Sequence, residues 1–314
     1  MLTPAVLARL KRCRSVLIAG AGGGYDVAGA IPLALALREH GLQAHFGSLS
    51  FSSLRHRMGL SPVAESPHLF EVTADHARSD VYCPEAWLSA WLARHQGWRA
   101  PVWCFEQCGV KPLRAAYQAL VSRLQLDGVV LMDGGIDLIL RGDETSIGTP
   151  AEDLASLSAV AGVDVEVKIV ACVGFGAEIR NRICHAQVFE RIAELSALGG
   201  YLGCSDLAGA PPHSHQYVEC MAFVFDNQSA VKRSHVHAVV LRALAGEFGS
   251  NRGESDVWIS PLLSIYWYFD LSTVADSHLF VAELEWTERL LEIVRYVEGL
   301  RRQLTVREPS RVPI

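Results

Sequence analysis

The stretch Ser15–Ala30, with the sequence SVLIAGAGGGYDVAGA, decides the fold of this chain. Ser15–Ala19 is short and apolar, as a buried strand is, and it runs into a glycine-rich turn before Asp26 opens a helix over Val27–Glu39. Glycines let the backbone turn sharply after a strand, and they bring helix N–H groups close to a ligand. A strand, a glycine turn and a helix form the opening unit of a parallel α/β sheet. The glycines exceed what a tight turn needs: Gly20, Gly22, Gly23 and Gly24.

The same alternation of apolar runs and helical patterns continues along the chain. Strands joined by helices of this length are typical of a parallel sheet with crossovers. We therefore expect a three-layer, Rossmann-like α/β sandwich with a mostly parallel sheet. Further strands are predicted at Leu42–Leu49, Leu69–Thr73, Pro101–Phe105, Val129–Met132, Glu166–Val173, Tyr201–Cys204 and Ile259–Phe269, and helices at Pro84–His95, Pro112–Leu126, Glu178–Leu198, His215–Phe225, Ser229–Phe248 and Phe280–Gln303.

We expect one α/β domain over residues 1–314 rather than two separate folding units. Residues 15–165 form its glycine-loop and acidic-loop half, and residues 166–303 form an elaborated C-terminal half. Within the first half, the polar stretch Arg141–Asp164 is predicted to be a loop over the sheet. Residues 304–314 are predicted to be a frayed tail.

The composition excludes several classes of protein. Half of the residues are hydrophobic and 20% are charged, so the chain can bury a core and is not a disordered protein. The net charge of −6 and the lack of a basic run argue against nucleic acid as a partner. The longest apolar run, Val27–Leu37, is far shorter than the roughly 20 residues that span a membrane. The N-terminus lacks a signal-peptide pattern, so a cytoplasmic protein is expected. The eight cysteines include no CxxC pair, and most are expected to be small core residues.

The first glycine loop lacks contacts that the usual nucleotide cofactors need. The nicotinamide fingerprint needs an acidic residue at the end of the second strand, but that strand ends in Gly47, Ser48 and Ser50. A Lys-Ser or Lys-Thr pair, which ATPase phosphate loops require, is also missing. Asp26 would repel a phosphate unless a metal ion or arginine intervened. Asp26 therefore caps the helix, holds a cation, or binds a cationic or hydroxyl group.

A second candidate segment is the acidic loop that follows the strand Val129–Met132. Asp133 ends that strand and Asp137 follows after Gly134 and Gly135. Ligands of open parallel sheets lie at the carboxyl ends of the strands, where Asp26 is also expected. Carboxylates gathered there suit Mg²⁺ or Mn²⁺, with Asp133 and Asp137 as ligands. The alternative is that both residues cap turns, while Arg141 pairs with Asp143 or Glu144 at the surface.

A second glycine loop follows the strand Glu166–Val173, with Gly174 and Gly176 before Glu178. It either flanks the same crevice as the first loop or serves only as a turn. His213 and His215 follow Pro211-Pro212, where a solvated or helix-capping role is more typical than metal binding. Cys204 lies next to Asp206, and its use as a nucleophile would require a base such as one of these histidines.

Together these motifs resemble domain-of-unknown-function family 1152. The segments that carry the resemblance are Gly20-Ala21-Gly22-Gly23-Gly24-x-Asp26, Asp133-Gly134-Gly135-x-Asp137 with Arg141-Gly142-Asp143-Glu144, Gly148-Thr149-Pro150-x-Glu152-Asp153, and Gly174-x-Gly176-x-Glu178. The likeness extends from about residue 15 to residue 300. It implies a prokaryotic, Rossmann-like protein and brings no established activity. Tyr25 stands where that family is expected to carry a small residue, which predicts a less open glycine loop.

The function expected from these features is that of an enzyme acting on a small polar metabolite or nucleotide. Hydrolysis or group transfer, metal-assisted or by acid–base catalysis, would occur at the carboxyl edge of the sheet. Asp133 and Asp137 are the predicted base or metal ligands, Asp26 the residue that orients the substrate, and Arg141 the group that neutralises an anion. The predicted ligand-binding residues are Gly20, Gly22, Gly23, Gly24, Gly134, Gly135, Arg141, Asp143, Glu144, Gly174, Gly176 and Glu178.

Two alternatives remain open at the level of sequence. One is an enzyme that uses S-adenosylmethionine or NAD, and the other is a non-catalytic ligand-binding or scaffold protein. A small-molecule ligand is expected in each enzymatic case, with neither nucleic acid nor a membrane as partner. The sequence leaves open whether the protein forms a homo-oligomer, and it does not name the substrate.

Overall fold

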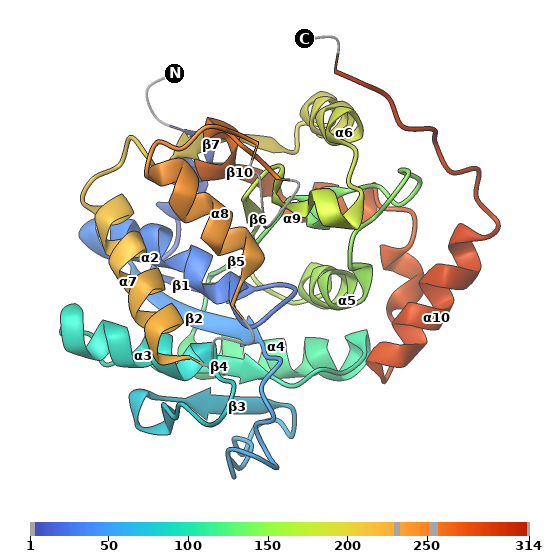
Figure 1. The fold of residues 1–314 in the computed structure, drawn as a ribbon. Coiled ribbons are helices and arrows are strands. Elements are labelled where there is room, and N and C mark those ends of the chain that lie inside the picture. The colour runs from blue at the N-terminus through green and yellow to red at the C-terminus, as the bar shows by residue number, and fades with distance from the viewer. Residues whose placement is uncertain (1–3, 229–232, 251–256, 313–314) are drawn as a thin grey trace.

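The structure, a computed structural model, describes residues 4–228, 233–250 and 257–312. Eight strands form one sheet in the order β3-β4-β2-β1-β5-β6-β10-β7 (Figure 1). Strands β4, β2, β1, β5 and β6 are parallel to their neighbours in this series, whereas β3 and β10 run antiparallel to theirs. The predicted α/β fold with a mostly parallel sheet is confirmed. The strands are β1 Ser15–Gly20, β2 Gln43–Leu49, β3 Leu69–Val72, β4 Val102–Phe105, β5 Gly128–Asp133, β6 Val167–Val173, β7 Tyr201–Asp206 and β10 Ile265–Asp270; β8 Gly249–Ser250 and β9 Trp258–Ile259 form a separate pair.

Helices cover both faces of the sheet, and each helical layer has its own apolar core (Figure 1). Along β1 the side chains alternate between the two cores: Val16 and Ile18 belong to one, and Leu17 and Ala19 to the other. This alternation follows from the period of two residues in a strand, and it explains why β1 is apolar throughout. The first layer contains α1 Ala5–Leu10, α2 Ala30–Glu39, α3 Pro84–His95, α7 His213–Asn227 and α8 His235–Leu244, and the second contains α4 Val110–Leu124, α5 Pro150–Ala161, α6 His185–Ala197, α9 Leu271–Asp276 and α10 Leu290–Arg301.

The order of the strands reverses at β1, and this reversal sets the position of the candidate site. From β1 the chain proceeds to β2 on one side, and it later returns to β5 on the other side. The backbone N–H of Ala21 donates to the carbonyl of Met132 at 2.9 Å, so the ends of β1 and β5 are joined. Asp26 and Asp133 therefore follow adjacent strand ends on the same edge, as expected. A crevice at such a reversal is where open α/β sheets bind ligands.

Two long helices predicted from the sequence are interrupted. The predicted helix Glu178–Leu198 is divided into the 3₁₀ segment η4, Ala177–Asn181, and α6, because Arg182 adopts a left-handed conformation with φ of 59°. The predicted helix Phe280–Gln303 is divided into η7, Val281–Leu284, and α10. The residues between them cap another helix, since the carbonyls of Thr287 and Glu288 accept N–H groups from the first turn of α4.

Four further predictions about local structure need correction. The predicted strand Ile259–Phe269 contains the 3₁₀ segment η6, Pro261–Ser264, so only Ile265–Asp270 continues as a strand. The polar stretch Arg141–Asp164 includes the buried helix α5 rather than a loop alone. The tail expected to be frayed is attached to α6, because the carbonyl of Ser310 accepts from the Cys184 thiol and that of Glu308 from Gln187. The predicted helix Ser229–Phe248 is shorter, with α8 beginning at His235, and residues 229–232 lie outside the described residues.

The structure bears on two features of the composition, the cysteines and the length of the apolar segments. Six of the eight cysteines are buried, in keeping with their predicted role as core residues. In the portion of the chain that the structure describes, no helix has both the length and the apolar character needed to cross a membrane.

Candidate functional site

The first glycine loop connects β1 to the 3₁₀ segment η1, Asp26–Gly29, which leads into α2. A side chain at Gly20 would place its Cβ 2.7 Å from the backbone nitrogen of Val27, so the turn requires glycine there. Asp26 does not cap α2, whose preceding residue is Gly29. Instead its carboxylate turns back over its own loop and accepts the N–H of Gly22 at 2.9 Å. The capping interpretation of Asp26 is therefore wrong, and its carboxylate lies at the strand ends.

The acidic loop brings two more carboxylates to the same edge. Asp133, the last residue of β5, accepts the N–H of Leu138 at 3.4 Å. Asp137 begins the 3₁₀ segment η3, Asp137–Ile139, and accepts the N–H of Thr149 at 3.3 Å. A Cβ at Gly148 would lie 1.8 Å from the Asp137 carboxylate, and Gly148 also has φ of 64°. Asp137 thereby holds the turn that precedes α5.

Two carboxylates from other elements complete the group. Glu178 accepts the N–H of Ile136 at 2.8 Å, and Asp153 extends from the first turn of α5. A Cβ at Gly22 would lie 2.0 Å from Oδ1 of Asp153, which places this carboxylate against the first glycine loop. We define the carboxylate cluster as Asp26, Asp133, Asp137, Asp153 and Glu178.

The glycines of these loops make room for the carboxylate cluster. A Cβ at Gly134 would lie 2.6 Å from Oδ1 of Asp26, and one at Gly135 would lie 2.5 Å from the carboxyl carbon of Glu178. Any residue with a Cβ atom at Gly134 or Gly135 would collide with these carboxylates, so the close approach of the loops requires glycine. Gly174 and Gly176 differ, because φ values of 101° and 97° demand glycine for the turn itself. Their predicted role in ligand binding stays a prediction.

Burial raises the pKa of every member of the carboxylate cluster. For Asp26 the pKa rises to about 7, mainly by desolvation, while backbone N–H groups of the loops oppose the rise. For Asp133 and Asp153 burial raises the pKa far more, and the neighbouring carboxylates raise it further. Asp137 and Glu178 hydrogen-bond to each other, so one carboxyl holds the proton that the other accepts, and the pKa of Glu178 is raised well above its usual value. Among the ion pairs of residues 4–228, 233–250 and 257–312, none joins a lysine or arginine to the cluster.

Asp153 is the member with the fewest partners. Its side chain is 6% exposed, and within the described ranges no hydrogen-bond donor of the protein reaches its carboxylate. A buried carboxylate without a donor is costly when ionised, so the proton is retained or a partner from outside the chain is required. From the sequence, Glu152 and Asp153 follow the turn Gly148-Thr149-Pro150 at the start of a helix, where the helix dipole alone explains their charge. The motif Gly148-Thr149-Pro150-x-Glu152-Asp153 was the signal that could have included it.

The predicted Mg²⁺ or Mn²⁺ site does not have a ready-made ligand set. Searched over the described residues, the structure contains no group of three or more His, Cys, Asp or Glu side chains that could hold a metal ion. Asp133 and Asp137 would have to reorient or be joined by ligand atoms to coordinate one. Metal binding at these two residues stays a prediction.

A comparison with protein-family models places the chain among known sequences. The model described as "Protein of unknown function (DUF1152)" matches residues 92–299, about two thirds of the chain. The chain belongs to the DUF1152 family. No curated protein and no solved structure matches it. The matched range of this DUF1152 chain includes Asp133, Asp137, Asp153 and Glu178, whereas Asp26 and the first glycine loop precede it.

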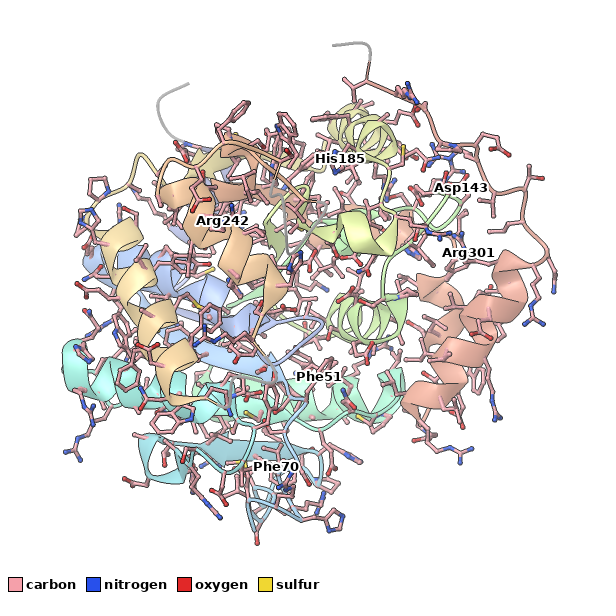
Figure 2. The ribbon with its side chains drawn as sticks, in the orientation of Figure 1. Phe51, Phe70, Asp143, His185, Arg242 and Arg301 are labelled. Atoms are coloured by element: carbon pink, nitrogen blue, oxygen red, sulfur yellow. The ribbon has the colours of Figure 1, made fainter. Side chains whose placement is uncertain are left out.

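Three predicted binding residues of this DUF1152 chain lie apart from the carboxylate cluster. Asp143 and Glu144 both pair with Arg307 at 3.1 Å, and Glu144 also accepts the backbone N–H of Arg141. Figure 2 shows Asp143 and Arg301 near α10, well away from Phe51 on the loop after β2. The expected pairing of Arg141 with these acids through its side chain is replaced by Arg307. These contacts attach the loop to the C-terminal tail.

The most deeply buried acid that sequence reasoning missed in this DUF1152 chain is Glu85. It lies in the first turn of α3, is fully buried, and accepts the hydroxyls of Ser48 and Ser52, each at 3.1 Å. The nicotinamide fingerprint needs an acidic residue at the end of β2, and in this structure α3 brings Glu85 to that place. Both of its oxygens are occupied by serine hydroxyls, so it fixes the end of β2 rather than offering a contact for a ribose. A serine-rich strand end followed by Pro84-Glu85 is the signal in the sequence.

Tyr25, which the sequence predicts to make the first glycine loop less open, has its aromatic ring outside the carboxylate cluster. Its ring is buried against Tyr82 and Phe225, with centroid separations of 6.0 and 5.7 Å. Its carbonyl accepts from Nε2 of His237 at 2.9 Å, and Nδ1 of that ring lies 2.7 Å from the Tyr217 hydroxyl. The residue thereby anchors the end of the loop to α7 and α8.

Proposed function

We propose that this protein is an enzyme that acts on a small polar metabolite by acid–base catalysis of hydrolysis or group transfer. The carboxylate cluster at the ends of β1, β5 and β6 would be the reacting site. The observation that carries the proposal is the convergence of four buried acids and the partly exposed Asp26 at the reversal point of the sheet. Structural stability alone does not favour such a cluster, because mutual repulsion and desolvation both oppose it.

Asp26 is the proposed general acid–base. A catalytic group works best when its pKa is near the operating pH, and burial places the pKa of Asp26 at about 7. It is also partly exposed, whereas Asp133 is only 3% exposed. Asp26 can therefore exchange a proton with a bound molecule. Asp133, whose pKa burial raises well above its usual value, keeps its proton and supports the acidic loop.

The remaining members would position the loops and the substrate. The shared proton between Asp137 and Glu178 joins the acidic loop to the second glycine loop. The carboxyl group of Asp153 has no hydrogen-bond donor among the described residues, and it would accept a hydrogen bond from a hydroxyl or amino group of the substrate. Among the described residues no lysine or arginine pairs with this cluster, which favours a neutral or cationic reacting group over a bare phosphate. A nucleotide would need a divalent cation to offset the charge of its phosphates. The test below therefore includes nucleotides with Mg²⁺ or Mn²⁺, so that a metal-assisted reaction can be detected.

Thermal-shift measurements on the wild type and Asp133→Asn test this proposal. The panel contains neutral polyols, nucleosides, amines, and nucleotides with and without Mg²⁺ or Mn²⁺. We expect at least one compound to stabilise the wild type, and we expect Asp133→Asn to lose that stabilisation while its own melting temperature stays equal or rises.

Asp164→Asn is the matched control, because Asp164 is exposed and lies outside the cluster. It should respond to the panel as the wild type does. An Asp133→Asn protein that is less stable by about 0.5–2 kcal/mol but binds normally would identify Asp133 as a turn cap and overturn the proposal. Silence of the wild type toward the whole panel would instead favour a scaffold protein.

A further inference from the structure

A surface cavity of about 330 Å³ lies at the amino ends of β2 and β4. Its walls are residues 42–45 at the start of β2, residues 99–101 just before β4, and the side chains of Arg38 and Trp98. The carboxylate cluster lies at the carboxyl ends of the strands, so the cavity is at the opposite edge of the sheet. Its volume falls within the range of about 300–1,000 Å³ that is typical of small-molecule sites.

The cavity carries two positive charges that the protein does not compensate. Arg38, in the last turn of α2, and Arg99 both line it, and both are exposed. In the described part of the chain its lining contains no aspartate or glutamate. Within residues 4–228, 233–250 and 257–312, neither guanidinium forms an ion pair, and the carboxylate of Glu39 lies 3.1 Å from Nε2 of His213 instead. A hollow with charge of one sign concentrates ligands of the other sign.

Contacts with the core hold both arginines in place. The Arg38 guanidinium lies over the Trp98 ring, 4.1 Å from its centroid, and Trp98 packs against the buried ring of Phe46 with a centroid separation of 5.2 Å. Arg99 lies in a turn in which the N–H of Ala100 donates to the carbonyl of Trp98 at 2.9 Å. The dipole of α2 explains a cation at Arg38 but not one at Arg99, which is outside any helix. A stacked guanidinium has less freedom to lose when an anion binds.

We propose that this cavity binds a small phosphate monoester, with the phosphate group held between Arg38 and Arg99. Such a group carries about 1.5 to 2 negative charges at pH 7, which two guanidiniums balance. Each guanidinium offers paired N–H donors that match two phosphate oxygens. Leu42 and Pro101 provide apolar walls for the organic part of the ligand. The proposal does not rest on the proposed function, because no residue of the carboxylate cluster lines this cavity.

Isothermal titration calorimetry at low ionic strength with D-ribose 5-phosphate, D-ribose and acetate tests the cavity. The wild type should bind the phosphate ester at least tenfold more tightly than ribose or acetate. Arg38→Gln and Arg99→Gln should each weaken binding of the ester by about 10- to 100-fold, because each removes charge-assisted hydrogen bonds. Arg38→Lys keeps the charge but loses the paired donors, so its loss should be smaller. The melting temperatures should stay those of the wild type, since both side chains are exposed.

Arg295→Gln is the matched control, because Arg295 is an exposed arginine on α10, in the other helical layer. It should bind the ester as the wild type does, and so should Asp133→Asn. Failure of the wild type to bind the ester, or equally tight binding of ribose or acetate, would overturn the proposal. An equal loss in Arg295→Gln would overturn it as well, since the attraction would then be unspecific. Loss of binding in Asp133→Asn alone would place the ester at the carboxylate cluster and exclude the cavity.

Discussion

Replacing Asp26 by asparagine should stabilise the protein at pH 8 and lose that advantage at pH 4. Burial raises the pKa of Asp26 from 3.8 to about 7. Such a group contributes stability below its unfolded pKa, and this contribution is lost as the pH rises through the folded pKa. At about 1.36 kcal/mol per pKa unit, the ionised carboxylate lowers the free energy of unfolding by about 4 kcal/mol at pH 8. The same cost falls below about 1 kcal/mol at pH 4.

Asparagine avoids the charge but accepts fewer hydrogen bonds from the loop. Gly22 donates to the carboxylate, and the N–H groups of Gly23 and Gly134 also favour its ionised form. An amide that leaves one of these donors unpaired costs about 1–3 kcal/mol. The net gain at pH 8 is then about 1–3 kcal/mol, or about 2–6 °C in melting temperature. At pH 4 the variant should be equal to or less stable than the wild type.

Urea denaturation followed by far-ultraviolet circular dichroism at both pH values measures this difference. Asp164→Asn provides the control, because an exposed aspartate should show little difference at either pH. Ligand binding or activity should be lost in Asp26→Asn at both pH values. A stability difference that is the same at pH 4 and pH 8 would refute the reasoning, since it would mean that Asp26 titrates normally in the folded protein.

Three other substitutions probe the surroundings of the site. Glu85→Ala should lower the free energy of unfolding by about 2–4 kcal/mol, because two serine hydroxyls lose their acceptor and a cavity forms. Glu85→Gln should lower it less. Equal stability of Glu85→Ala and the wild type in urea would contradict this. Burial lowers the pKa of His237 to about 4, so the free energy of unfolding of the wild type should fall by about 2–3 kcal/mol between pH 7 and pH 4.5. The melting temperature of His237→Gln should depend less on pH. An unchanged pH dependence would argue against a buried neutral histidine. Arg307→Ala should lower the free energy of unfolding by about 1–2 kcal/mol, because buried Glu144 loses its cation, and it should leave unchanged the stabilisation by any compound found in the thermal-shift panel. Loss of that stabilisation would bring the Arg141–Glu144 segment back into the site.

The strands and most helices could be predicted because their signals are local. α3 has the bounds that Pro84 and the polar end at His95 predict, since proline favours the first turn of a helix. The position of β10 could not be predicted in this way. Its antiparallel insertion between β6 and β7 depends on pairing with strands far away in the sequence. The interruption before α10 likewise depends on a distant partner, the N-terminus of α4.

The candidate site was predictable only where a carboxylate directly follows a strand. Asp133 ends a strand, and Asp26, Asp137 and Glu178 lie in or just after the glycine loop that follows one; the contacts among their loops agree with a shared edge. Asp153 escapes the rule because a carboxylate in the first turn of a helix is usually explained by the helix dipole. Only the placement of α5 over the first glycine loop shows that its side chain reaches the other acids. The close approach of Gly22 to Asp153 is a tertiary fact with no counterpart in local sequence.

The late insertion of β10 has a consequence for synthesis on the ribosome. β6 and β7 are consecutive in the chain, yet the slot between them is filled by Ile265–Asp270. The central strands from β4 to β6 pair among themselves and can assemble while translation continues. Until residue 270 has emerged, however, β6 keeps an open edge, and β7 has no partner in the sheet. Nascent chains that stall in this interval would expose strand edges that favour association with other chains. The synthesis of β10 therefore decides when the exposed edges of β6 and β7 become paired.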